Sequence, residues 1–294
     1  MNTAGPTSAH RRAILTMVVA AFLWSIAGVL TRHLDSAKSF EVTFWRSLFC
    51  ALTMLAWFAY TQGLGAMSYV RASGKAGLLS GVMWAVMFTC FMIALTMTST
   101  ANVLIVNALS PLFATLLAWM VLKAPIASRT WFAIAAAMVG MMIMFAAQAQ
   151  GGAGVWLGMI VAFGVPVASA INIVTLKKTG AHVDLAPAVL IGAVISCAVT
   201  LPLSMPFAAT AKDVGLLAIL GVFQLGIPCV MMVRASAHLS APEVALLGLL
   251  EVLMGPLWSW LGAGEVPPGS TLLGGAIVLA ALVGNAVAPK RRLP

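Results

Sequence analysis

Charged side chains are scarce in this chain. Asp, Glu, Lys and Arg make up 8% of its 294 residues, whereas hydrophobic types make up 62%. A soluble globular domain carries about 25% charged residues, so this sequence has too little polar surface to face water. The composition excludes a soluble fold and predicts helices of about 20 apolar residues that cross a membrane.

The motifs of metal, disulfide and nucleotide sites are also missing. Four cysteines stand isolated in apolar runs without CxxC or Cys/His spacing, and we expect them to be small buried hydrophobes. The glycines at 151–154 follow no strand and precede no Lys-Ser/Thr pair, which a phosphate-binding loop needs. No constellation of catalytic side chains occurs at membrane depth. We therefore expect no cofactor, no metal and no enzymatic activity.

The formal charge of +9 does not indicate nucleic-acid binding, because the sixteen Lys and Arg are scattered in ones and twos between apolar runs. The expected partners are the lipid bilayer and a small-molecule substrate. A monomer is one of the oligomeric states that this pattern allows.

Polar and Gly/Pro breaks divide the chain into ten apolar spans. They lie near residues 12–33, 41–61, 73–97, 100–122, 127–148, 154–178, 185–206, 212–237, 241–262 and 269–288. The connections between them are short, so we expect no extramembrane domain.

The positions of Lys and Arg predict the orientation of these spans. With a cytoplasmic N-terminus, twelve of the sixteen cations fall in cytoplasmic segments, three (Arg32, Lys38 and Lys212) fall outside, and Arg46 lies within a span. An even number of spans then returns the C-terminus to the cytoplasm. The absence of an N-x-S/T sequon suits a bacterial inner membrane, which is the expected location.

A weak internal repeat relates the two halves of the chain. A displacement of 141 residues brings Leu109–Ala124 onto Leu250–Glu265, and each stretch precedes a glycine-containing last helix. Each half, 1–149 and 150–294, holds five spans. Because five is odd, the second copy has the opposite orientation, as in the inverted repeats of secondary transporters. The predicted fold is all-α and membrane-embedded, with ten helices in two inverted five-helix repeats.

Several short segments carry a family resemblance. They are Ala21–Ser25 with Arg32 in the first span, Phe44–Arg46 opening the second, the 99–122 helix with Pro111, and the Gly264-Glu265 turn. In their order the chain resembles the ten-helix EamA-type branch of the drug/metabolite transporter superfamily, which includes YddG-like exporters of amino acids and metabolites. One departure is that the family's Gly-Glu after the fourth span reads Lys123-Ala124 here.

Ionisable residues inside spans are costly and are candidates for function. Glu251 lies near the middle of its span, where it either faces a cavity and binds an ammonium group or a proton, or caps a broken helix. Arg46 either meets a substrate carboxylate from the outer side or pairs with Asp35 or Glu41. Arg234, with His238 and Glu243, forms either a gate ion pair or a plain interfacial cluster.

Prolines and polar side chains mark the remaining candidates. Pro111, Pro166, Pro228 and Pro256 interrupt spans and are candidate hinges; packing kinks are the alternative. Uncharged polar and aromatic residues are candidates for lining a midplane pocket, with core packing or lipid contact as the alternative for each aromatic. Together with Glu251, the candidate substrate-binding residues are Trp24, Trp84, Phe88, Asn102, Asn107, Phe163, Asn172, Gln224 and Trp258.

These observations predict a secondary transporter. The resemblance implies export of aromatic or other neutral amino acids and related metabolites by alternating access. Multidrug or organic-cation efflux is the alternative, favoured by the Trp and Met content. Coupling to protons has one candidate, Glu251, and a facilitator driven by the substrate gradient is also compatible with the sequence.

Overall fold

The described residues of the computed structural model are 8–37, 39–123, 128–148, 153–179, 186–236, 238–239 and 241–287, and they contain helices but no strand. The first half holds α1 (Ser8–Ser25), α2 (Ala27–Thr31), α3 (Ser39–Gln62), η1 (Gly63–Gly65), α4 (Ala66–Ala72), α5 (Gly74–Met97), α6 (Thr100–Ala108), α7 (Ser110–Leu122) and α8 (Ser128–Gln148). The second half holds α9 (Ala153–Ala162), α10 (Gly164–Thr179), α11 (Ala186–Ser204), α12 (Ala211–Ile219), η2 (Leu220–Gly226), α13 (Ile227–Ser236), α14 (Ala241–Ala263) and α15 (Gly269–Val287).

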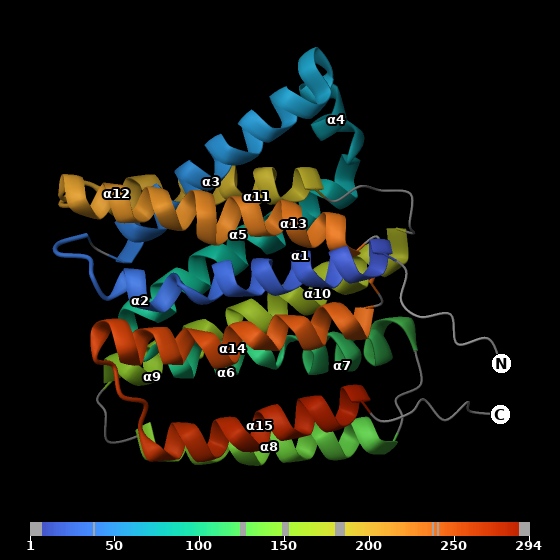
Figure 1. The fold of residues 1–294 in the computed structure, drawn as a ribbon, viewed down its shortest axis with the longest axis vertical. Helices are drawn as coiled ribbons and strands as arrows, with labels where there is room; N and C mark the ends of the chain where they lie inside the picture. Colours follow the sequence, from blue (N-terminus) through green and yellow to red (C-terminus); the bar gives the residue numbers. More distant parts are fainter. Residues whose placement is uncertain are drawn as a thin grey trace.

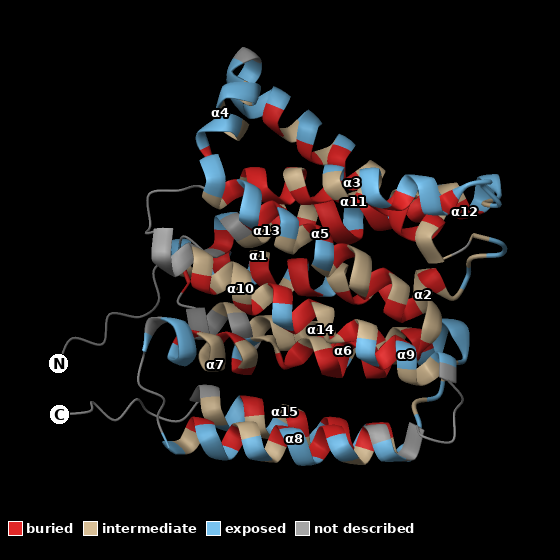
Figure 2. Ribbon diagram, turned by 180° about the vertical axis from the view of Figure 1, so that it is seen from behind, coloured by how far each residue is buried: buried red, intermediate tan, exposed pale blue. Residues whose placement is uncertain are grey.

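The long helices run roughly alongside one another in a layered bundle (Figure 1). The first residue of α1 and the last residue of α15 lie at the same end of this bundle, which we call the terminal end; the opposite end is the distal end. The end of α3 and the short α4 project from the bundle and are largely exposed (Figure 2).

The surface of the bundle is apolar. Phe132, Leu15 and Leu272 expose 76%, 64% and 59% of their area, a pattern that a water-soluble protein avoids over so large a surface. Seven helices of the described part are long and apolar enough to cross a membrane, and three shorter apolar helices lie at Ser128–Met144, Leu247–Ala263 and Gly269–Asn285. The all-helical membrane fold predicted from composition is confirmed.

Three of the four candidate hinge prolines lie next to a junction between two helical segments. Pro111 is in the first turn of α7, directly after the break at Leu109, and Pro166 is in the first turn of α10, after the break at Phe163. A first-turn proline loses no helix hydrogen bond, so both positions tolerate it. Pro228 follows the π-helical η2. Pro256 differs because it lies inside the continuous helix α14.

Helix contacts repeat when the two halves are exchanged. In the first half α1 packs on α14 and α13, and in the second half α9 and α10 both pack on α5, with α10 also packing on α7. In the same way α5 packs on α11. In the second half η2, which occupies the position corresponding to α5, packs on α3. α3 and α11 pack on each other, as do α8 and α15. The bundle core therefore lies between the halves, and each half contributes helices to it.

Glycines allow a close approach of the helices α8 and α15. A Cβ atom on Gly140 would lie 2.6 Å from the carbonyl oxygen of Gly274, and a Cβ on Gly274 would overlap the carbonyl of Gly140. Without a hydrophobic driving force between helices in lipid, such close backbone contact is a main source of helix association.

We expect Gly274→Ala to destabilise the α8–α15 pair by about 1–3 kcal/mol, because the added methyl group meets backbone that cannot move aside. Gly284→Ala on the same helix is the matched control, since a Cβ atom at that position would have no neighbour within 4 Å. Thermal unfolding of the purified protein in detergent measures both. Equal melting temperatures for the two variants would contradict this account of the interface.

Candidate substrate-binding cavity

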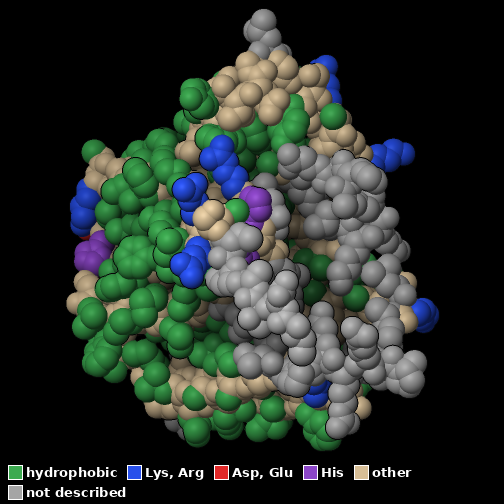
Figure 3. Space-filling view, turned by 45° about the vertical axis from the view of Figure 1, so that its right-hand side comes forward, with side chains coloured by type: hydrophobic (Ala, Val, Ile, Leu, Met, Phe, Trp, Pro, Cys, Tyr) green, Lys and Arg blue, Asp and Glu red, His purple; other side chains and the backbone are tan. Residues whose placement is uncertain are grey.

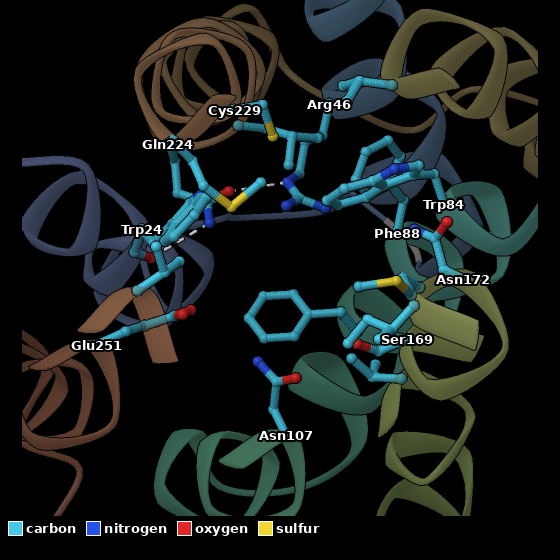
Figure 4. A pocket seen from close by; sticks show the side chains of 18 of the residues that line it. Trp24, Arg46, Trp84, Phe88, Asn107, Ser169, Asn172, Gln224, Cys229 and Glu251 are labelled. Carbon is cyan, nitrogen blue, oxygen red and sulfur yellow. Dashed lines mark hydrogen bonds between the residues drawn. The ribbon is translucent and has the colours of Figure 1, made fainter. Parts of the chain in front are cut away.

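A cavity of about 570 Å³ lies inside the bundle between the two halves. Its volume is within the range of about 300–1,000 Å³ that small-molecule sites occupy. The walls come from α1, α3, α5 and α6 of the first half and from α10, α11, η2, α13 and α14 of the second. Polar and aromatic side chains from these elements face the same space in Figure 4.

Seven of the ten predicted substrate-binding residues line this cavity. They are Trp24, Trp84, Phe88, Asn107, Asn172, Gln224 and Glu251. Ser169 also lines it and was not singled out from the sequence. Ser169 lies three residues before Asn172 on α10, and residues three apart share a helix face. The prediction of Asn172 could therefore have been extended to Ser169 from the sequence.

The other three predicted residues have partners away from the cavity. Buried Asn102 donates to Thr98 Oγ1 and accepts from Thr271 Oγ1, at 3.0 Å each. Trp258 donates to Ser25 Oγ at 3.0 Å, and its ring contacts that of Phe22 edge-on.

Phe163 is the third of these residues. Its ring centroid lies 6.1 Å from that of Phe113, in a separate apolar pocket between α7, α8 and α9. Packing and internal hydrogen bonds therefore account for Asn102, Trp258 and Phe163.

Arg46 is buried in the cavity wall, with 2% of its area exposed. Its Nε donates to Gln224 Oε1 at 3.0 Å, and its guanidinium carbon lies 5.9 and 5.7 Å from the ring centroids of Phe88 and Phe91. Figure 4 shows the guanidinium reaching the open space. The expectation that Arg46 pairs with Asp35 or Glu41 is wrong.

Both of those acids have other partners. Asp35 forms an ion pair with Lys212 at 2.8 Å, and Glu41 accepts hydrogen bonds from the backbone N–H groups of Ala208 and Ala209. The helix α3 therefore turns Glu41 towards the distal end and Arg46 inwards, a division that the sequence alone does not reveal.

Gln224 is held in place by an unusual backbone. It lies on the π-helical turn η2, and its Nε2 donates to the carbonyl oxygen of Trp24 at 3.2 Å. A Cβ atom on Gly221 would lie 2.6 Å from the carbonyl oxygen of Arg46, so glycine lets η2 approach α3 at this point. π-helical turns are rare and frequently occur at functional sites.

Glu251 lies on a different wall from Arg46 (Figure 4). α14 is continuous around it, so Glu251 does not cap a broken helix. Among the described residues no side chain or backbone group forms a hydrogen bond or an ion pair with its carboxylate. The cavity thus carries one acidic and one basic group.

Arg234 does not line the cavity. Its guanidinium stacks over the ring of Trp57, 4.3 Å from the centroid, and the residue is exposed at the end of α13. The backbone carbonyl oxygen of His238 lies 3.2 Å from Nδ1 of His10. The side chain of Glu243 lies outside the described residues.

The cavity extends towards the terminal end. Its wall includes the first residue of α11, Ala186, together with Met232 near the end of α13 and Val244 in the first turn of α14. Figure 3 turns this end of the molecule forward and shows a recess with hydrophobic side chains at its base.

Polar contacts join the two halves at the distal end. Arg32 Nε donates to Glu265 Oε2 at 2.8 Å, and its Nη atoms donate to the carbonyl oxygens of Leu95 and Thr98. Glu265 also accepts from the backbone N–H and the hydroxyl group of Thr100, at 2.6 and 2.9 Å. We call Arg32, Glu265 and Thr100 the distal clamp.

A second set of contacts lies beside the clamp. Asp213 accepts hydrogen bonds from the backbone N–H groups of Asp35, Ser36 and Ala37, at 2.7, 3.1 and 3.2 Å. It also completes a capping box with Thr210 at the start of α12. A single buried carboxylate therefore ties the loop after α2 to the second half.

The comparisons with known proteins agree with this architecture. The model of the EamA-like transporter family matches residues 11–146 and again 156–287. The chain belongs to the EamA-like transporter family. This confirms the family resemblance noted in the sequence, and the family consists of transporters.

Individual relatives of this EamA-family protein are distant. Pseudopaline exporter CntI of two Pseudomonas aeruginosa strains is 25% identical over 276 residues, covering 92% of this chain and 94% of the relative. A solved structure described as "Crystal structure of protein" superposes with a TM-score of 0.65 at 18% identity, covering 97% of this chain and all of the other. The latter likeness concerns the fold alone.

Access to the cavity can be tested with adjacent cysteines on α10 in a cysteine-free background. We expect Ser169→Cys to react with a polar maleimide, because Ser169 lines the cavity. Ala168→Cys is the matched control, and should react more slowly by roughly tenfold or more, because Ala168 is 2% exposed. Similar labelling rates in detergent would show that the cavity is inaccessible or lined differently.

Proposed function

We propose that this EamA-family protein exports amino acids or related small metabolites across the bacterial inner membrane by alternating access. The observation that carries the proposal is a cavity built by both halves, extended to one end of the bundle, sealed by polar contacts at the other, and charged on two walls. The exporter among its relatives supports the direction of transport.

The proposed topology has ten membrane crossings and cytoplasmic termini. Its support is the excess of Lys and Arg in the segments assigned to the cytoplasm, and the helical segments that occupy each of the ten expected ranges. With this orientation the terminal end is cytoplasmic, and the cavity faces the side from which an exporter loads.

The proposed halves, 1–149 and 150–294, form inverted repeats. The family model matches once within each half, and helix contacts in one half have counterparts in the other. Two such halves rocking about the central cavity would expose it to either side in turn.

The distal clamp supplies the asymmetry that such a cycle needs. Displacement by 141 residues relates Glu265 to Ala124 and Arg32 to Ile173. The two positions that the repeat relates to the clamp therefore carry neither the acid nor the base that joins the halves at the distal end. This difference favours a resting state that is closed at the distal end and loaded from the cytoplasm.

Organic-cation efflux is the second candidate function. Glu251 is the single acid among the described lining residues, and Trp24 and Trp84 offer aromatic faces to a cation. Arg46 in the same wall repels a cation, which favours a molecule that also carries a negative group.

Transport is tested with purified protein in liposomes and a panel of labelled amino acids and organic cations, with and without a pH gradient. We expect amino-acid flux above that of protein-free liposomes, and we expect Glu251→Gln to reduce it about tenfold, since loss of a charged hydrogen bond has this size. Absence of flux for every compound would refute the transporter assignment of this cavity. Flux that ignores both the gradient and Glu251→Gln would refute proton antiport.

The clamp is tested in the Ser169→Cys background with an impermeant maleimide added from the distal side. We expect Glu265→Gln to raise the labelling rate about tenfold. Loss of a part-buried charged contact destabilises the state that is closed at the distal end and so increases the population of the distal-open state. Lys212→Gln is the control: it removes an ion pair between the same halves whose side chains are 55% and 52% exposed, and such pairs contribute little. Equal effects of the two variants would contradict the role of the clamp.

A further inference from the structure

Arg46 carries a donor with no partner. Its Nη1 is buried and makes no hydrogen bond with any described residue, and the residue as a whole is 2% exposed. No described acidic side chain forms an ion pair with Arg46. An arginine keeps its charge at any accessible pH, and a buried charge without a partner is strongly destabilising. A protein retains such a group where a ligand completes its contacts.

The surroundings of Arg46 orient the guanidinium for a ligand. Gln224 Oε1 accepts from Nε, so this nitrogen is already bonded and the Nη end remains for another acceptor. Gln224 is fixed in turn by its bond to the Trp24 carbonyl, and Phe88 and Phe91 flank the cation. A guanidinium held in this way presents a planar fork that matches a carboxylate.

We infer that Arg46 binds the carboxylate of the transported molecule inside the cavity, and that Gln224 is a positioning residue that aims the guanidinium. This inference rests on the proposed transport function and adds the chemical group by which the site selects its substrate. Glu251, on another wall and without a hydrogen-bond partner among the described residues, accepts the ammonium group. The apolar remainder of the molecule lies against the aromatic walls.

The charge balance of the cavity favours a single carboxylate over other anions. A doubly charged phosphate would meet the negative Glu251 in the same low-dielectric space and be repelled. A simple organic cation would leave Arg46 unpaired and add repulsion from it. An amino acid pairs its carboxylate with Arg46 and its ammonium group with Glu251. Blocking either charged group removes one of these contacts.

The experiment measures ligand-dependent thermal stabilisation of the purified full-length protein, which reports binding without transport. The probes are phenylalanine, its methyl ester and its N-acetyl derivative, with leucine and its corresponding derivatives as a second series. In the wild type we expect the methyl ester to need about tenfold or more higher concentration than the parent amino acid, because it lacks the charged contact with Arg46.

Variants assign this preference to Arg46. Arg46→Gln should remove the difference between the amino acid and its ester. Gln224→Glu, which has nearly the same shape, places a carboxylate on the guanidinium and should weaken amino-acid binding about tenfold or more even if Arg46→Gln fails to fold. Arg71→Gln, which removes an exposed arginine outside the cavity, is the matched control and should keep the wild-type preference.

Each result bears on a separate claim. Equal stabilisation by amino acid and ester in the wild type overturns the inference, and so does a preference that survives both Arg46→Gln and Gln224→Glu. Flux of amino acids together with such a result keeps the proposed function and rejects the role of Arg46. Carboxylate-dependent binding without any flux in liposomes keeps the Arg46 site and rejects amino-acid export.

Discussion

A bilayer supplies no hydrogen-bond partners, so each polar group at membrane depth must find its partner within the protein or face a water-filled cavity. This constraint organises the whole structure. Apolar side chains cover the outside of the bundle, and glycines such as Gly140 and Gly274 let helices meet through their backbones. The polar side chains of the cavity and of the distal contacts lie between the two halves.

The five acids whose side chains the structure describes divide between these two places. Asp35, Glu41, Asp213 and Glu265 lie at the distal end, and each bonds a group in the other half of the chain. Glu251 lines the cavity. The contacts at the distal end thus join the two halves, and the proposed rocking motion would break them together, whereas the charge in the cavity would remain available to a ligand.

The candidate site was partly predictable from residue type. Polar groups in apolar spans are costly, and this reasoning selected Asn107, Asn172, Gln224 and Glu251, all of which line the cavity. The same reasoning selected Asn102, which instead bonds Thr98 and Thr271, because cost alone does not separate a ligand contact from an internal one. Aromatic residues were less predictable: Trp24, Trp84 and Phe88 face the cavity, whereas Phe163 and Trp258 pack elsewhere.

The sequence by itself determined the class of fold, because hydropathy is a sum over local residues and does not depend on how helices are arranged. It also determined the family, since the order of short motifs survives at low identity. What Arg46 contacts could be read only from the tertiary structure. Its partner Gln224 is 178 residues away, on a π-helical turn whose glycines allow a close approach to α3. The helix α3 buries apolar side chains such as Met54 and exposes others such as Leu52, so hydropathy does not mark its inward side, and packing with neighbouring helices sets the direction of Arg46.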